Sequence, residues 1–223
     1  MEKNKKTLLA GLFMTALFIV WTAMLRSADV QPVGLNETDI GFASLNVWFH
    51  KLTGEHMWLY TITDWLGLVP IFICLIFAGI GLVQLVLRRS LLKVDKNIIL
   101  LGVYYTAVIF AYLIFEMIPL NYRPVLIEGR MEASYPSSTT LLVLSVMPTL
   151  CFQANRRVKG IRLKYIINTF AVLFTMFMVA GRTISGVHWL TDIIGSVLLS
   201  SGMFLFYMFS AQTADAPKRL NGE

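Results

Sequence analysis

The sequence predicts an all-α integral membrane protein, and three observations support that prediction. The chain has 223 residues, of which 57% are hydrophobic and only 14% are charged, and its mean hydropathy is +0.68. A soluble domain of this length needs more charge to cover its surface. Several apolar stretches are long enough to cross roughly 30 Å of hydrocarbon, which takes about 20 helical residues. Because backbone amides find no water there, we expect these stretches to be helices.

We expect a polytopic bundle of six transmembrane helices that forms a single domain over residues 1–223. The predicted spans are residues 7–24, 65–87, 98–118, 140–152, 166–180 and 189–209. The fourth is short and could extend back to Pro136. After the first span, residues 40–52 mix apolar and polar side chains in a pattern typical of an amphipathic helix at the membrane interface, with Trp48 and Trp58 as possible anchors.

The distribution of Lys and Arg predicts the orientation of the bundle. One set of loops, with both chain ends, holds 14 of the 19 basic residues, including Lys218 and Arg219 near the C-terminus. Loops rich in Lys and Arg remain on the cytoplasmic side of a membrane, so we expect both termini to be cytoplasmic. The short loops favour a bacterial inner membrane. The net charge is +6, but the basic residues lie in these loops without interleaved aromatic residues, so we expect no nucleic-acid partner.

Cysteine and histidine placement argues against a metal or a cofactor. Cys74 and Cys151 both fall in apolar stretches, where they are interpreted as buried small residues. None of the three histidines (His50, His56 and His188) has a partner at a metal-ligand spacing. We therefore expect no bound cofactor.

The most informative polar segment runs over residues 181–192, on the predicted outer side. His188 and Asp192 are four residues apart and share one helical face, so the carboxylate can accept the proton of one imidazole nitrogen and leave the other free to attack. Arg182 lies six residues before His188, and its planar guanidinium suits a phosphate. An isolated His-x-x-x-Asp pair is more often a hydrogen-bonded helix end, yet an Asp inside an apolar span tends to be functional.

Two further outer segments carry polar groups. Pro136 is predicted to open a helix, where its missing N–H costs nothing, and the hydroxyls of Ser137, Ser138 and Thr139 follow it. Such a helix start attracts anions, although simple capping explains it equally well. Arg123 follows the third predicted span and on its own is ordinary for a membrane edge. Jointly, the three segments suit the binding of a phosphate and its attack by histidine.

These segments resemble the type 2 phosphatidic acid phosphatase superfamily of membrane lipid phosphatases. That family carries the motifs Lys-x6-Arg-Pro, Pro-Ser-Gly-His and Ser-Arg-x5-His-x3-Asp. The matching residues here are Arg123-Pro124, Pro136-Ser137, and Arg182, His188 and Asp192 at the spacing of the third motif.

The resemblance implies a role for each matching residue. His188 would be the nucleophile that forms a phosphohistidine, and Asp192 would orient it. The phosphate oxygens would be held by Arg123, Arg182, Ser137 and the backbone N–H of Ser138. The partner would be a lipid phosphate in the outer leaflet.

Departures from the family motifs include Glu116 in place of the lysine, Gly181 in place of the serine, and Thr139 in place of the histidine that protonates the leaving group. A threonine hydroxyl is far too weak an acid for that role. Three alternatives follow. Glu116, if buried, could serve as a substitute acid. A lipid diphosphate, whose leaving group is a phosphate, could need no acid. Finally, the protein could bind or move a lipid phosphate without hydrolysing it, and a phosphotransferase is a related enzymatic possibility.

Overall fold

The computed structural model describes residues 2–215, and the regular structure of this part of the chain is helical. Eight α-helices and two short 3₁₀ turns follow one another along the chain. Their bounds are α1 Glu2–Met24, η1 Leu35–Glu37, α2 Ala43–Thr53, α3 Met57–Leu66, α4 Leu68–Arg88, η2 Leu91–Lys93, α5 Lys96–Met117, α6 Ser138–Arg157, α7 Ile161–Ile184 and α8 Leu190–Asp215. The all-α prediction is confirmed.

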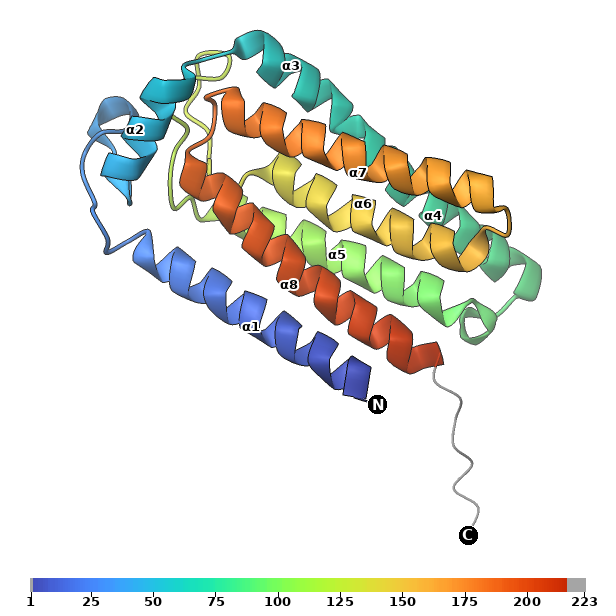
Figure 1. Cartoon of the computed structure of the whole chain (residues 1–223). Helices are drawn as coiled ribbons and strands as arrows, with labels where there is room; N and C mark the ends of the chain where they lie inside the picture. Colours follow the sequence, from blue (N-terminus) through green and yellow to red (C-terminus); the bar gives the residue numbers. More distant parts are fainter. Residues whose placement is uncertain (1, 216–223) are drawn as a thin grey trace.

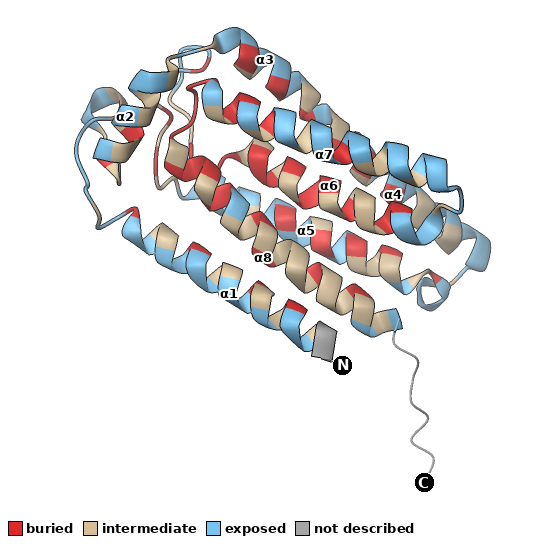
Figure 2. Ribbon diagram, viewed as in Figure 1, coloured by how far each residue is buried: buried red, intermediate tan, exposed pale blue. Residues whose placement is uncertain are grey.

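The long helices lie side by side in one bundle (Figure 1), and the outside of that bundle is apolar. Large hydrophobic side chains such as Phe13 on α1, Phe72 on α4 and Phe110 on α5 are all more than half exposed. Figure 2 shows exposed residues along the outer faces of α1 and α7. Exposure of an apolar surface of this extent to water is unfavourable, so the outside of the bundle is suited to contact lipid.

Five helical segments among residues 2–215 are long and apolar enough to cross a membrane: Asn4–Met24, Met57–Arg88, Lys96–Met117, Ile161–Ile184 and Leu190–Asp215. They correspond to five of the six predicted spans. The remaining predicted span lies in α6, which does not meet the same criteria. The count of six therefore stays a prediction.

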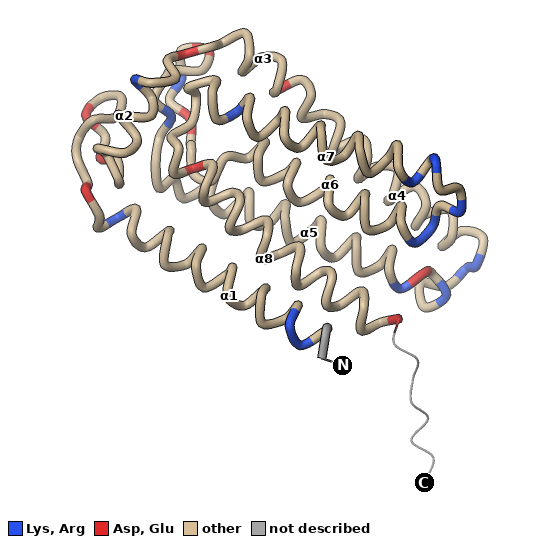
Figure 3. The backbone as a smooth tube through the Cα atoms, in the orientation of Figure 1, with Lys and Arg blue, Asp and Glu red and all other residues tan. Residues whose placement is uncertain are grey.

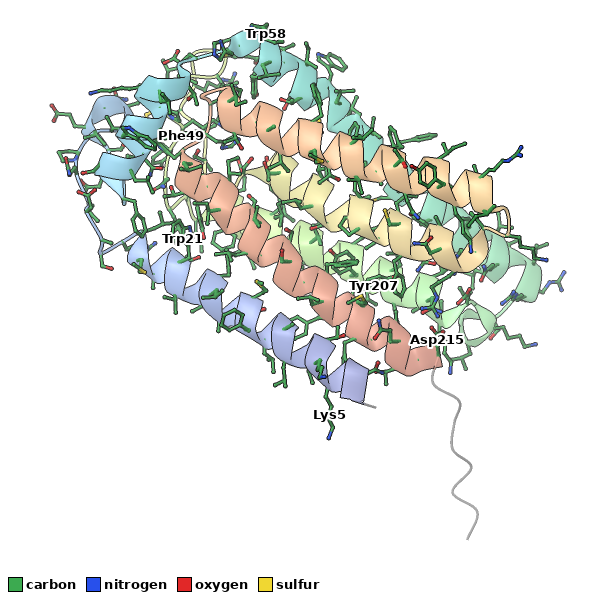
Figure 4. The ribbon with its side chains drawn as sticks, in the orientation of Figure 1. Lys5, Trp21, Phe49, Trp58, Tyr207 and Asp215 are labelled. Atoms are coloured by element: carbon green, nitrogen blue, oxygen red, sulfur yellow. The ribbon has the colours of Figure 1, made fainter. Side chains whose placement is uncertain are left out.

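Helix α6 is more polar because it lies between other helices, packed against α4, α5, α7 and α8. Two of its buried polar side chains pair with neighbouring helices: the Tyr105 hydroxyl bonds to Thr149 Oγ1 at 2.7 Å, and Gln153 donates to the Tyr207 hydroxyl at 2.5 Å. Tyr207 lies inside the bundle (Figure 4). An interior helix needs no apolar outer face, since polar contacts between helices stabilise it instead.

The segment that joins α1 to α3, with α2 in it, lies at one end of the bundle, and α3 then runs beside α7 toward α4 (Figure 1). The predicted interfacial helix over residues 40–52 begins three residues later as α2, and Trp48 and Trp58 are both largely exposed. The second predicted span begins at 65, but the helix is interrupted at Gly67, where α3 meets α4. This break places α3 beside the end of α7, with Gly181 so close to Thr63 that a Cβ there would lie 2.7 Å from the threonine methyl.

Charged residues divide the bundle into two unlike ends (Figure 3). Lys and Arg gather at the end formed by the start of α1, the α4–α5 turn and the α6–α7 turn. The opposite end mixes acidic and basic residues around the α5–α6 and α7–α8 loops. The described part of the chain begins and ends at the basic end, whereas Lys218 and Arg219 lie outside the described residues. The assignment of the basic end to the cytoplasm stays a prediction.

Candidate active site

Side chains from distant parts of the sequence meet at the end of the bundle opposite the basic one. Arg123 comes from the α5–α6 loop, Arg182 from the end of α7, His188 from the α7–α8 loop and Asp192 from the first turn of α8. All four are buried. Nη2 of Arg182 lies 3.5 Å from Nε2 of His188. Both guanidinium groups lie over the ring of Tyr60, at 4.7 Å for Arg182 and 5.7 Å for Arg123.

The start of α8 fixes Asp192. Trp189 stands just before the helix and has no side-chain oxygen with which to cap it. The Trp189 backbone N–H instead donates to Asp192 Oδ2 at 2.9 Å, a reciprocal contact typical of a helix start. Asn46 of α2 supplies the missing cap, because its Oδ1 accepts from the Thr191 N–H at 3.2 Å. Helix α2 thus holds the start of the helix that carries the carboxylate.

The structure corrects the expected direct bond between His188 and Asp192. His188 Nδ1 and Asp192 Oδ2 are 3.9 Å apart, too far for a hydrogen bond. Ser134 lies between them, with its Oγ 3.1 Å from His188 Nδ1 and 2.5 Å from Asp192 Oδ2. Direct contact fails because the carboxylate is also held by the Trp189 N–H and, on Oδ1, by Asn121 Nδ2 at 3.3 Å. Sequence reasoning missed both Ser134 and Asn121, since neither follows a recognisable spacing.

Both buried arginines keep unpartnered donors. Arg123 pairs with Glu132 at 3.1 Å, yet its Nη1 has no hydrogen-bond partner. Arg182 Nε and Nη1 also lack one, and the nearest carboxylate oxygen, Asp64 Oδ1, is 3.6 Å from Nη1. Buried donors are normally paired, and two neighbouring cations repel each other. The arrangement is therefore suited to an anion with several oxygens.

The surroundings of His188 favour its neutral form. Burial lowers the pKa of this imidazole well below its ordinary 6.5, and the positive charges of Arg123 and Arg182 lower it further. Because a guanidinium can only donate, Nε2 must be the acceptor of the Arg182 contact, which places the proton on Nδ1. Nε2 thus carries no proton, and its lone pair points toward Arg182.

Comparison with known proteins fits this geometry. The family model described as PAP2 superfamily matches residues 6–215. This chain belongs to the PAP2 superfamily. Among solved structures, the crystal structure of the first transmembrane PAP2-type phosphatidylglycerolphosphate phosphatase from Bacillus subtilis matches with a TM-score of 0.66 at 15% identity. The match covers 95% of this chain and 98% of that one. No curated protein sequence matches the chain.

The PAP2 residues predicted at the start of α6 are placed in two ways. Ser137 is completely buried, and its hydroxyl donates to Thr140 Oγ1 at 3.0 Å. Ser138 and Thr139 instead line a cavity of about 510 Å³ together with Asp64. The three hydroxyls therefore do not point at one spot, because the first turn of the helix directs Ser137 inward. Thr139, which stands where the PAP2 motif has histidine, faces the cavity.

Glu116 does not meet the condition of burial, since it is exposed near the end of α5. The carboxylates that contact the two arginines are instead Asp64 of α3 and Glu132 of the α5–α6 loop. The sequence gives no signal for either residue, because Asp64 precedes the first PAP2 motif and Glu132 lies between the first and the second.

The cavity extends from Asp64 and Thr139 between three helices of the PAP2 bundle. Apart from Asp64, Ser138 and Thr139, its lining is largely apolar, from α4, α5 and α6: Leu68, Ile71, Val108, Ile109, Leu141 and Leu142. It does not include His188, but Asp64 contacts Arg182 and so lies at the border between the cavity and the arginines. A polar site thus adjoins an apolar groove within the bundle.

Proposed function

We propose that this PAP2 protein is a membrane lipid phosphatase that acts through a phosphohistidine on His188. The observation that carries the proposal is the pair of buried arginines with unpartnered donors beside the unprotonated Nε2 of His188. A phosphate placed there would accept hydrogen bonds from the unpartnered N–H groups of Arg123 and Arg182. The apolar groove bordered by Asp64 and Thr139 would accommodate a lipid chain.

The chemistry follows from these positions. The lone pair on Nε2 attacks phosphorus, and the bond from phosphorus to the leaving oxygen breaks. The proton on Nδ1 stays in place, and the arginines stabilise the charge on the equatorial oxygens. Water then attacks the phosphohistidine, the P–N bond breaks, and Nε2 regains its lone pair as inorganic phosphate departs.

The leaving group decides which lipid suits this site. Thr139 cannot protonate an alkoxide, and Asp64, which also lines the cavity, contacts Arg182 with its Oδ1 3.6 Å from Nη1. When the terminal phosphorus of a lipid diphosphate is attacked, the leaving group is the lipid monophosphate, which needs no proton. We therefore place a lipid diphosphate, of the isoprenoid kind, ahead of a phospholipid monoester as the substrate.

Phosphate release from a panel of lipid mono- and diphosphates in mixed micelles tests the proposal. His188→Ala is expected to lower the rate by on the order of 10⁴-fold or more, as removal of a nucleophile does. His56→Ala is the matched control, because His56 bonds to the Thr53 carbonyl and contacts neither arginine. Unchanged phosphate release in His188→Ala would show that His188 is not the nucleophile.

The same preparation separates the alternatives. Labelled phosphate trapped on His188 is expected for the phosphatase. Product that appears only with an added acceptor alcohol would indicate a phosphotransferase. Lipid binding without release or trapping would indicate a binding or transport protein.

We also propose that the site faces the outer leaflet of a bacterial inner membrane, with both termini in the cytoplasm. The gathering of Lys and Arg at the other end of the bundle supports this orientation. Replacement of Cys74 and Cys151, followed by single cysteines at Asp39 and Lys159, allows labelling by an impermeant thiol reagent. Labelling at Asp39 alone in intact cells is expected, and labelling at Lys159 alone would reverse the assignment.

A further inference from the structure

A serine stands between the histidine and the carboxylate of the site. Ser134 is 2% exposed, and its Oγ contacts His188 Nδ1 at 3.1 Å and Asp192 Oδ2 at 2.5 Å. The direct Nδ1–Oδ2 separation of 3.9 Å exceeds a hydrogen bond. The carboxylate therefore reaches the ring only through this hydroxyl.

The directions of the hydrogen bonds are determined by their partners. Arg182 donates toward His188 Nε2, so the imidazole proton lies on Nδ1 and is donated to Ser134 Oγ. The single hydroxyl proton of Ser134 is then donated to Asp192 Oδ2, which also accepts from the Trp189 N–H. In the two hydrogen bonds that link Nδ1 to Oδ2, the donor and the acceptor are therefore both determined.

The backbone holds Ser134 in this place. Its N–H donates to the carbonyl of Asn121 at 2.9 Å, and the Asn121 side chain donates to the other carboxylate oxygen, Asp192 Oδ1, at 3.3 Å. Asn121 is itself buried. The α5–α6 loop therefore contacts the carboxylate at two points, and Asp192 cannot move toward the ring without losing both.

We propose that Ser134 is a positioning residue that fixes the tautomer and orientation of His188 on behalf of Asp192. As the ring becomes positively charged during attack on phosphorus, its Nδ1–H bond to Ser134 strengthens, and Ser134 passes the influence of the carboxylate to the ring. The reaction itself is unchanged: the P–N bond forms at Nε2, the bond to the leaving oxygen breaks, and no proton leaves Nδ1. The catalytic part of this inference rests on the proposed phosphatase activity.

Four variants test it. Ser134→Ala removes the hydroxyl, Ser134→Cys keeps the volume with a weak donor, and Ser134→Thr restores a hydroxyl. Ser200→Ala is the matched control, because Ser200 is equally buried but bonds only to a carbonyl of its own helix, Val197 O. Loss of a hydrogen bond to a charged group lowers kcat by about 10- to 100-fold. We expect that loss in Ala and Cys, with KM nearly unchanged, a rate close to wild type in Thr, and no change in Ser200→Ala.

The ¹⁵N signals of the imidazole give a second readout that needs no substrate. The chain has only three histidines, so the His188 signals can be assigned by substitution. We expect a single Nδ1–H tautomer in the wild type and a mixture of tautomers in Ser134→Ala and Ser134→Cys.

The two readouts separate the two proposals. A wild type that releases no phosphate from any lipid would overturn the proposed function, while the tautomer would still report whether Ser134 fixes the ring. Full kcat with an unchanged tautomer in a folded Ser134→Cys protein would overturn the role of Ser134. Loss of rate in Ser200→Ala as well would do the same, since any buried serine would then suffice.

Discussion

Arg157 and Arg182 lie at opposite ends of the bundle, and their guanidinium groups have unlike surroundings. Arg157 Nε donates to Gln153 at 2.7 Å and its Nη2 donates to Asp95 at 2.8 Å. Arg182 is more deeply buried, yet its Nε and Nη1 have no hydrogen-bond partner. The polar groups around Arg157 stabilise the fold, whereas those around Arg182 leave space and charge for a ligand.

The difference is also one of stability. A buried charge without a good partner is unfavourable, so the site end of the bundle carries a cost that the basic end does not. The remaining groups at the site compensate in part, because Asp192 accepts hydrogen bonds from Ser134, Asn121 and the Trp189 N–H. The carboxylate is satisfied while the guanidinium is not, as expected for a site that awaits an anion.

For this comparison, the largest effect is expected from replacing each of the two arginines with methionine. Arg182→Met should lower kcat/KM by about 10²- to 10³-fold, as the loss of a donor to the transition state does, without lowering Tm. Arg157→Met should lose about 1–2 kcal/mol of stability, or roughly 2–8 °C in Tm, at nearly unchanged kcat/KM. Phosphate release and thermal unfolding in the same detergent measure both. A fall in Tm for Arg182→Met as large as that for Arg157→Met would break the comparison.

A second prediction concerns the leaving-group side of the site. Thr139→His should place a proton donor beside the cavity that Thr139 lines. The rate on lipid monoesters should rise by about tenfold or more, because general acid catalysis contributes 10² or more when fully effective. The rate on lipid diphosphates should stay the same. Thr139→Asn is the matched control without an acid, and an equal gain on both lipids would point to a change in binding instead.

A third prediction concerns pH. Since burial and the two arginines hold the pKa of His188 well below 6.5, kcat/KM should not fall as the pH is lowered through 6.5. Arg123→Gln removes one positive charge, so the pKa of His188 should rise and the acid limb should move to higher pH. A limb in the same place in both proteins would show that Arg123 does not act on the ring.

The same shift has a consequence for folding. The unfolded chain binds a proton at His188 near pH 6.5, whereas the folded chain does not. Stability contributed by this group is therefore present above pH 6.5 and is lost as the pH falls below it. Urea unfolding of the wild type and His188→Gln at several pH values measures the difference, which should shrink as the pH falls below 6.5.

The smallest effect is expected for Glu116→Gln. Glu116 is exposed near the end of α5 and does not line the cavity that holds Thr139. Turnover should equal that of the wild type. A large loss would restore Glu116 as the substitute acid and would require α5 to move.

Much of the fold could be predicted from hydropathy. The predicted span 98–118 agrees with α5 to within two residues at each end. The predicted span 189–209 begins one residue before α8 and ends six residues before that helix does. The prediction was less successful where packing competes with composition. Helix α6 is longer than the predicted residues 140–152, because polar residues such as Gln153 continue the helix inside the bundle. The break at Gly67 was also not foreseen, since apolar residues continue through it.

The sequence by itself determined the helical membrane class, because hydropathy acts over a few residues, and its motif spacing singled out His188 and Asp192, although His188 lies in the loop before α8 and not on the same helix. Only the tertiary structure decided that Ser134 stands between them, that Asn46 caps α8, and that Asp64 rather than Glu116 borders the arginines. Those contacts join residues 54 to 145 positions apart. They depend on how whole helices pack against each other, and no pattern within one segment encodes that.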